Sequence, residues 1–581
     1  MLLALTCAFS VAAQVRHLDQ NWSENDRQWF YTTPQGSKLI LYDWAFALER
    51  ADSEALWIEN LERFYFLPNG QSSVNPDGLP VGLVKDDSHL GLTCAACHTN
   101  QVQVRGTTYQ IDGGPTNADL YAFLADLGAS LDVTSRNPGN LKFLRFAKRV
   151  LKSKDTPANR AQLYTKLRNY NAYYSQFIKD STPNVAWGRS RTDAFGMIFN
   201  RVTSIDLKIP ANSRKPDAPV SYPFLWDTSW HNKVQWNGSA PNSFAIERLA
   251  RNVGEVLGVF AEIELKKPTF LHWYYESTAK RLNLLAIEDR LANLRSPKWQ
   301  NEWGAVDQAK ATRGQAIYKA QCESCHKIAT PGRHQNVVMT PLSQIGTDTT
   351  MATVAAERKA KTGVLQGVRE MLIFGKPMGA VTYAGTITFN AVIGAILSPV
   401  EMRATESAEE GAPLTNDDMH DPERARIRTA LLAGPQRSEA TTKSSAASTN
   451  ESVAATSAPR DELLTTLRSM GARKTTQQDT DSELAYKARP LDGIWATAPY
   501  LHNGSVPTID DLLRPVADRP RTFHVGSREL DLVKMGFVTT PVEGSFLFDT
   551  SIEGNRNTGH DWGTSLSAQE RADLIEYLKT L

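Results

Sequence analysis

The most constraining feature of this chain is a five-residue motif that occurs twice, as Cys94-Ala-Ala-Cys97-His98 and as Cys322-Glu-Ser-Cys325-His326. C-x-x-C-H is the attachment signature of c-type haem. Two thiols in one turn can each add to one vinyl group of a single porphyrin, and the adjacent imidazole can bind the iron from the same side. The motif predicts two covalently bound haem c groups, with His98 and His326 as proximal ligands.

Two alternatives use the same cysteines. Four cysteines in two C-x-x-C pairs could form a Cys₄ zinc site, and a single pair could act as a thioredoxin-like redox pair. Neither alternative explains why a histidine follows both cysteine pairs. Haem attachment assigns a role to both cysteines and to the histidine of each motif, so the sequence favours it.

The first 13 residues, MLLALTCAFSVAA, resemble the apolar core of a secretory signal peptide, with a suitable cleavage point before Gln14. The basic residues that usually precede such a core are missing, and the alternative is a buried N-terminal helix. Cys7 would leave with the signal, and its surroundings match a lipidation box poorly. Because the cysteine motifs also require export, we expect a periplasmic or secreted protein.

Composition excludes several classes of protein. The chain has 581 residues, of which 41% are hydrophobic and 22% are charged, as in a soluble globular protein with a full core. Its net charge of +1 gives no field to attract nucleic acid or an anionic membrane. No apolar run reaches the ~18 to 20 residues of a membrane span. We therefore expect no nucleic-acid partner and no transmembrane segment.

The expected fold is mainly α, with two cytochrome c-like haem domains, long irregular loops and little β structure. The domains are predicted at 14–297 and 298–581, with one motif in each. In the first domain, a short hairpin should turn at Arg105-Gly106, and helices such as 117–131 and 158–174 should follow it.

The second half has the pattern of a small cytochrome c domain. A helix over 307–320 precedes the second motif, and a capping box, Ser567 with Glu570, opens an apolar last helix. Gly314 would let the last helix cross the first closely. This arrangement resembles the class I cytochrome c fold. Residues near 438–460 are rich in Ser, Thr and Ala without an aromatic residue, and we expect a disordered insertion there.

Three tryptophans gather in one short segment, Trp226, Trp230 and Trp236. Such a cluster is typical of a core or a pocket wall. In a chain with two haems it is also a candidate electron relay, with Trp226 and Trp236 as its members. Both interpretations stay open at this point.

The motifs and three further segments resemble the bacterial di-haem cytochrome c peroxidase superfamily, and within it the rubber-oxygenase-like branch most closely. The segments are Ile111-Asp-Gly-Gly-Pro115, residues 488–504 (ARPLDGIWATAPYLHNG) and Gly559-His560. The resemblance covers most of 90–581, although the insertion departs from it. It implies that the His98 haem is the reactive one and that the His326 haem passes electrons.

Candidates for the sixth iron ligands follow. His560 is the candidate at the second haem, with Met378 as the methionine alternative, and His502 matches a family histidine that lies near the haem. We expect the first haem to be open or weakly capped. The weakest candidates are His89, His231 and His272.

Other groups complete the predicted sites. Arg105 and Arg489 could pair with haem propionates, because a guanidinium matches a carboxylate; the alternative for each is a solvated surface arginine. A peroxidase site also needs a group that moves protons to the departing oxygen, and no local motif identifies it. A structural Ca²⁺ ion occurs in some members of the superfamily, but no acidic loop here is specific enough to locate one.

Three functions are compatible with these features. The first, which we favour, is a periplasmic peroxidase. Electrons from a small cytochrome c or cupredoxin would enter at the His326 haem and reach the His98 haem, which would reduce hydrogen peroxide. The second is a dioxygenase that cleaves an apolar, unsaturated substrate with O₂ at the same haem. The third is a non-catalytic electron carrier with both haems six-coordinate.

Overall fold

A computed structural model describes residues 15–269, 273–372, 374–398, 422–433, 464–469 and 483–581. The predicted signal peptide, His272 and the predicted insertion near 438–460 lie outside these residues. Within them, no helix has both the length and the apolar character needed to cross a membrane.

Two small sheets hold the first motif. One sheet pairs β2 (Ile40–Leu41) and β3 (Leu83–Asp86) with the central β4 (His89–Leu92), and the other pairs β1 (Arg16–His17) and β5 (Thr99–Val104) with the central β6 (Thr107–Asp112). The motif occupies the connection from β4 to β5. The predicted hairpin is confirmed, because β5 and β6 pair and the chain turns at Arg105 and Gly106, both with positive φ.

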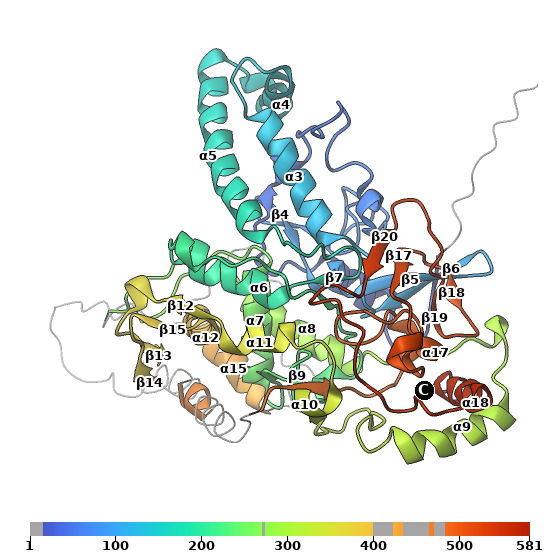
Figure 1. The fold of residues 1–581 in the computed structure, drawn as a ribbon. Helices are drawn as coiled ribbons and strands as arrows, with labels where there is room; N and C mark the ends of the chain where they lie inside the picture. The colour runs from blue at the N-terminus through green and yellow to red at the C-terminus, as the bar shows by residue number, and fades with distance from the viewer. Residues whose placement is uncertain (1–14, 270–272, 373, 399–421, 434–463, 470–482) are drawn as a thin grey trace, which may run out of the picture.

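An arm of three helices extends away from the body of the molecule (Figure 1), made of α3 (Leu120–Thr134), α4 (Leu141–Leu151) and α5 (Pro157–Ser181). The predicted helices 117–131 and 158–174 correspond to α3 and α5. The helix α5 continues further than predicted because Tyr174 and Phe177 extend its apolar face. Both rings pack against Phe260 and anchor the arm in the body.

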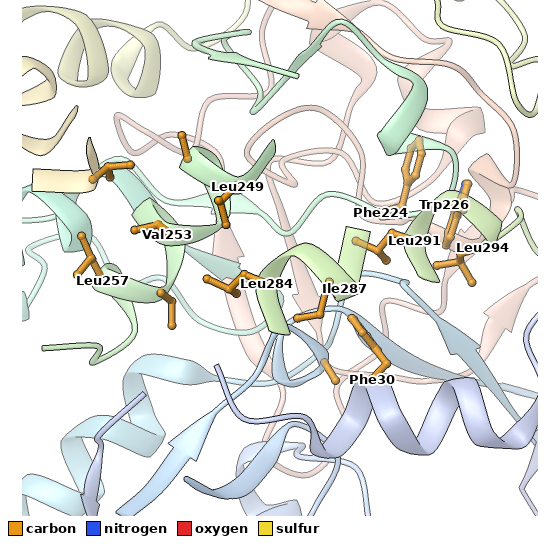
Figure 2. Close-up of a cluster of buried hydrophobic side chains, with 14 of the residues drawn as sticks. Phe30, Phe224, Trp226, Leu249, Val253, Leu257, Leu284, Ile287, Leu291 and Leu294 are labelled. Atoms are coloured by element: carbon orange, nitrogen blue, oxygen red, sulfur yellow. The ribbon is translucent and has the colours of Figure 1, made fainter. Parts of the chain in front are cut away.

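The centre of the molecule is a layer of helices, α6 (Ala194–Phe199), a π-helical turn (Asn200–Asp206), α7 (Ala245–Gly258), α8 (Arg281–Asn293) and α12 (Ala384–Ile396). Apolar residues recur at helical spacing on α7 and α8, so each helix has one apolar face. Figure 2 shows Leu249 and Val253 of α7 near Leu284 of α8, and Trp226 beside Leu291 and Leu294. Charged residues of α7 and α8 lie within electrostatic reach of the first motif.

The second half of the chain is built mostly from short elements. They are α9 (Gln308–Gln321), β11 (Val338–Pro341), α10 (Leu342–Ile345), α11 (Thr350–Glu357), β12 (Lys359–Lys361), β13 (Arg369–Met371), β14 (Phe374–Pro377), β15 (Val381–Tyr383), α15 (Pro422–Ala433), β16 (Ala485–Ala488), α17 (Ile509–Leu512), β17 (Thr522–Val525), β18 (Leu530–Asp531), β19 (Gly536–Phe537), β20 (Phe546–Asp549) and α18 (Ala568–Leu578).

The two halves share a core. Both α11 and α12 lie within the predicted second domain, yet they pack against α6 and α7 of the first. One cluster of buried side chains runs from Leu18 to Leu581. Helices exceed strands in the described part of the chain, as expected for a mainly α protein, whereas a division into two haem domains at residue 297 stays a prediction.

The helices α9 and α18 cross beside the second motif, as the resemblance to class I cytochromes implied. A Cβ atom at Gly314 would lie 2.0 Å from the Asp573 carbonyl oxygen and 2.9 Å from the Tyr577 Cβ atom. The Arg313 guanidinium donates two hydrogen bonds, of 2.7 and 2.8 Å, to the Asp573 carboxylate. The predicted capping box at Ser567 is also present.

Replacing Gly314 should therefore separate these helices. We expect Gly314→Ala to lower the free energy of unfolding by about 1–3 kcal/mol, the usual cost of overpacking, although alanine favours a helix over glycine by roughly 1 kcal/mol. Urea unfolding followed by circular dichroism measures the change. The matched control is Gly385→Ala in α12, where no atom lies within 4 Å of the new Cβ. A destabilisation of the same size in both variants would contradict the close crossing.

Candidate haem-binding sites

Both motifs adopt the same local structure. The amide of His98 donates to the Cys94 carbonyl at 3.0 Å, and the amide of His326 donates to the Cys322 carbonyl at 2.8 Å. Each motif is therefore a single turn with its histidine next to its two thiols. All four cysteines are free, and no metal-binding group of three or more His, Cys, Asp or Glu residues occurs in the described chain. A shared Cys₄ zinc site is thus excluded.

The two proximal histidines are oriented in the same way. The Nδ1 atom of His98 donates to the Pro223 carbonyl oxygen at 2.8 Å, and that of His326 donates to the Arg489 carbonyl oxygen at 2.8 Å. Because a carbonyl only accepts, each Nδ1 carries the proton and each Nε2 keeps a free lone pair. Burial lowers the pKa of His98 to about 4 and also lowers the pKa of His326. Both rings are neutral, as an iron ligand must be.

The second site is an apolar cavity with His560 opposite the proximal histidine. The ring centroids of His326 and His560 are 6.0 Å apart. Two metal–imidazole bonds of about 2 Å, together with the distance from each nitrogen to its ring centre, account for a separation of this size. The Nδ1 atom of His560 is buried with no hydrogen-bond partner in the described structure. Burial, followed by the nearby His326, lowers the pKa of His560 to about 3. These residues fit a haem iron held between two histidines.

A loop before α18 holds His560 in place. Gly559 has a φ of +70°, and a Cβ atom there would lie 2.3 Å from the Ile345 carbonyl oxygen. The His560 amide donates to this same carbonyl at 2.8 Å. Arg519 donates to the carbonyl oxygens of Asn557, Gly559 and His560. The glycine and the arginine together fix the backbone from which the imidazole projects.

The other predicted ligands occupy different places. His502 lines the second cavity, but its ring stacks on Tyr486 with centroids 4.1 Å apart. Met378 is buried in the hydrophobic core and is not among the cavity-lining residues. His89 lies in the sheet of β4 and contacts Ser88. His560 is thus the predicted sixth ligand that faces a proximal histidine.

The two predicted arginines also differ. Arg489 is buried in the wall of the second cavity, where its guanidinium lies 4.8 Å from the ring centroids of both Phe224 and Trp236. Burial lowers the pKa of Arg489 to about 10, and no ion pair is found for it in the described chain. Arg105 instead lies on the exposed β5–β6 turn and donates to the Glu302 carbonyl. Arg105 is therefore a surface arginine, whereas Arg489 is buried.

Of the three tryptophans, two lie between the sites. Trp226 stacks on Phe224 with centroids 4.7 Å apart, and its indole donates to the Asp492 carbonyl at 2.8 Å. Trp236 lines the second cavity, and its indole donates to the Ser221 carbonyl. Trp230 points elsewhere and lies near His334. Trp236 is therefore part of the cavity wall and Trp226 part of the hydrophobic core.

A structural repeat underlies the two sites, and the sequence analysis missed it. The backbone conformation of residues 221–241 matches that of residues 487–507, position by position, with a constant difference in residue number. Both segments contain a left-handed residue (Asp227, Gly493), a 3₁₀ turn (Thr228–Trp230, Ile494–Ala496) and a left-handed glycine (Gly238, Gly504). The signal is present in the sequence as Trp236-Asn-Gly-Ser and His502-Asn-Gly-Ser.

The two copies of this repeat are joined by reciprocal hydrogen bonds. The Ser221 amide donates to the His502 carbonyl at 2.9 Å, and the Lys487 amide donates to the Trp236 carbonyl at 2.8 Å. At the constant offset these pairs are equivalent, which is the mark of a local two-fold axis. The two proximal histidines therefore bind equivalent positions of two segments that face each other.

A polar cluster lies near the first motif, and sequence reasoning missed it as well. We call it the Glu255 cluster; its members are Glu255 and Arg251 on α7, Glu288 on α8 and Gln235. Gln235 donates to the Glu255 carboxylate at 2.9 Å, and Arg251 pairs with Glu288. Burial and then nearby charges, Glu255 among them, raise the pKa of Cys94 and Cys97 to about 12. The cluster thus lies within electrostatic reach of both thiols.

Comparisons with known proteins find two family models that match the second half of the chain. A model of the RoxA-like, cytochrome c-like family matches residues 485–524, and a model described as cytochrome c oxidase, cbb3-type, subunit III matches residues 309–389. These segments contain the second motif, Arg489 and His502, and they show that the chain carries cytochrome c-like domains, which implies covalently bound haem c.

Two proteins of Sinorhizobium fredii (strain NBRC 101917 / NGR234) are similar in sequence. The uncharacterised protein y4iM is 38% identical over 144 residues, which cover 21% of this chain and 33% of y4iM. The uncharacterised protein y4iJ is 32% identical over 638 aligned positions, which cover 98% of this chain and 93% of y4iJ. The chain therefore belongs to the family of y4iJ.

Proposed function

We propose that this protein is a di-haem oxidoreductase of the peroxidase type, in which the second site relays electrons to a reactive first site. The observation that carries the proposal is the difference between the two sites. At the second site, His560 faces His326 across the cavity. At the first site, the Tyr222 ring lies 6.2 Å from the His98 ring, and the Glu255 cluster lies within electrostatic reach of Cys97.

The exposure of the two motifs supports this direction of electron flow. The second motif lies at the surface, with Glu323, Ser324 and Lys327 exposed. Ala95 and Ala96 of the first motif are buried. A small electron-donor protein, a cytochrome c or a cupredoxin, can approach the second haem edge, whereas the first haem is screened from another protein.

The segment between the sites gives the electrons a short path. Trp236 lines the second cavity, and the residue before it, Gln235, contacts Glu255 of the first site. The Arg489 guanidinium bridges the rings of Trp236 and Phe224, on which Trp226 stacks. Aromatic rings and a cation thus form a continuous contact between the sites, and we assign the relay to Trp236 and Trp226.

The chain must also supply protons. Haem iron, when bound, supplies the redox centre. Reduction of hydrogen peroxide breaks its O–O bond and uses two electrons and two protons to give two molecules of water. Burial raises the pKa of Glu255, partly offset by Arg251. Its carboxyl group can therefore hold a proton and donate it to the departing oxygen. The hydrogen bond from Gln235 orients that group.

The dioxygenase is a second candidate. The match of residues 485–524 to the RoxA-like family favours it. The same reactive site would then bind O₂ instead of peroxide, and an apolar substrate would have to reach it. Turnover assays with peroxide and with a polyisoprene separate the two reactions.

Carbon monoxide tests the difference between the sites. It binds ferrous haem only where the sixth position is open or readily vacated. We expect the reduced protein to bind about one CO per chain, and His560→Ala to bind two, because the second iron loses its sixth ligand. The visible difference spectrum measures binding, with haem content determined on the same samples.

Two further variants control this experiment. His560→Met keeps a ligand and should still bind one CO, and so should His524→Ala, because His524 contacts Ser545 away from both sites. Absence of CO binding in the unmodified protein would reject both enzymatic proposals and leave an electron carrier.

A Glu255→Gln substitution tests the proton donor. We expect kcat for peroxide to fall about 10²- to 10⁴-fold, the usual contribution of a general acid, with unchanged haem content and spectrum. In the unmodified protein kcat should decline as pH rises through the raised pKa of Glu255, because the protonated form is lost, and this limb should vanish in the variant. Steady-state kinetics across pH measure both effects. The exposed Glu264→Gln is the control, and an unchanged pH profile in Glu255→Gln would reject the assignment.

A further inference from the structure

The charge of this protein is strongly segregated. Residues 136–168, which form the outer part of the arm, contain ten Lys or Arg residues and one Asp. Their net charge is +9, so the rest of the chain carries −8. The overall charge of +1 hides this asymmetry.

Some of these cations fasten the arm to the body. Glu49 is buried and accepts hydrogen bonds of 2.7 Å from Arg145 and 2.8 Å from Arg149, with Lys142 at 3.6 Å. These hydrogen bonds outweigh burial and lower the pKa of Glu49. Their function is structural, because they neutralise one buried carboxylate.

Of the other seven cations, Arg136 and Arg160 pair with Asp132 and Asp155. The last five are exposed and have no ion pair in the described structure: Lys148, Lys152 and Lys154 at the tip of the arm and Lys166 and Arg168 along α5. Charges closer together than about 8 Å act jointly at physiological salt. The tip therefore presents a concentrated positive field.

An exposed leucine accompanies these lysines. Leu141, at the start of α4, is 69% exposed. Lys148 follows it by two helical turns and lies on the same face. Basic side chains next to an apolar one are typical of helices that bind an anionic lipid interface. Nucleic acid would gain nothing from the leucine.

The shape of the arm points to the same partner. Figure 1 shows the tip, where α4 meets α5, projecting away from the body and from the second motif beside α9 and α18. A projecting tip cannot enclose a small anion, but it can reach a flat surface before any other part of the molecule. We propose that the tip of the arm docks on the anionic headgroups of a lipid bilayer.

Co-sedimentation of the haem-loaded, full-length protein with lipid vesicles tests this proposal. The protein should bind vesicles of phosphatidylcholine with phosphatidylglycerol, less strongly as salt rises, and should not bind phosphatidylcholine alone. Each lysine near an anionic bilayer strengthens binding about five-fold. The triple variant Lys148→Gln, Lys152→Gln, Lys154→Gln should therefore bind roughly 100-fold more weakly, and Leu141→Ser should weaken binding further.

A matched control separates the arm from net charge. The triple variant Lys359→Gln, Lys361→Gln, Lys376→Gln removes three exposed lysines elsewhere and should bind the vesicles as the unmodified protein does. Equal weakening by both triple variants, or binding to neutral vesicles, would overturn the proposal. So would a protein that ignores vesicles but binds duplex DNA or an acidic protein through the arm lysines. None of these measurements depends on turnover at the haems.

Discussion

A hydrogen bond from each proximal histidine to a backbone carbonyl is the interaction on which both sites depend. His98 reaches Pro223 and His326 reaches Arg489, partners 125 and 163 residues away in the chain. Each bond selects the tautomer that can bind iron and fixes the plane of the ring. It also ties a local cysteine motif to the repeated segment, so that formation of a competent site requires the whole fold.

The repeated segments explain how one scaffold holds two candidate haem sites with different surroundings. Reciprocal backbone hydrogen bonds place them about a local two-fold axis, and the side chains break that symmetry. Position 236 is a tryptophan and its counterpart 502 is a histidine stacked on Tyr486. His560 comes from a loop outside the repeat, and the Glu255 cluster comes from α7 and α8. Backbone symmetry brings the sites together, and these additional elements make them unequal.

The features that were predictable from sequence depend on short-range constraints. The spacing of C-x-x-C-H is set by covalent chemistry, and the hairpin at Arg105-Gly106 is required by local sterics. The glycine at position 314 was predictable only through the resemblance to the class I cytochrome c fold, because its constraint is the contact with Asp573 of α18. The Glu255 cluster was not predictable, because the sequence does not show that α8 and Gln235 pack around this carboxylate of α7. The surroundings of Arg105 were not predictable for the same reason, because Glu302, whose carbonyl accepts its hydrogen bond, is distant in the sequence.

The net charge of the sequence also failed to predict a local feature of the surface. A net charge of +1 suggested no attraction to anionic surfaces, but electrostatic fields in salt decay within about 8 Å. At that range the relevant quantity is the charge of a patch and not that of the chain. The arm separates the positive patch from the acidic remainder by the length of α5, about 37 Å at 1.5 Å per residue. Helical length, more than composition, therefore lets one nearly neutral protein present a strongly basic surface while its haem sites lie elsewhere.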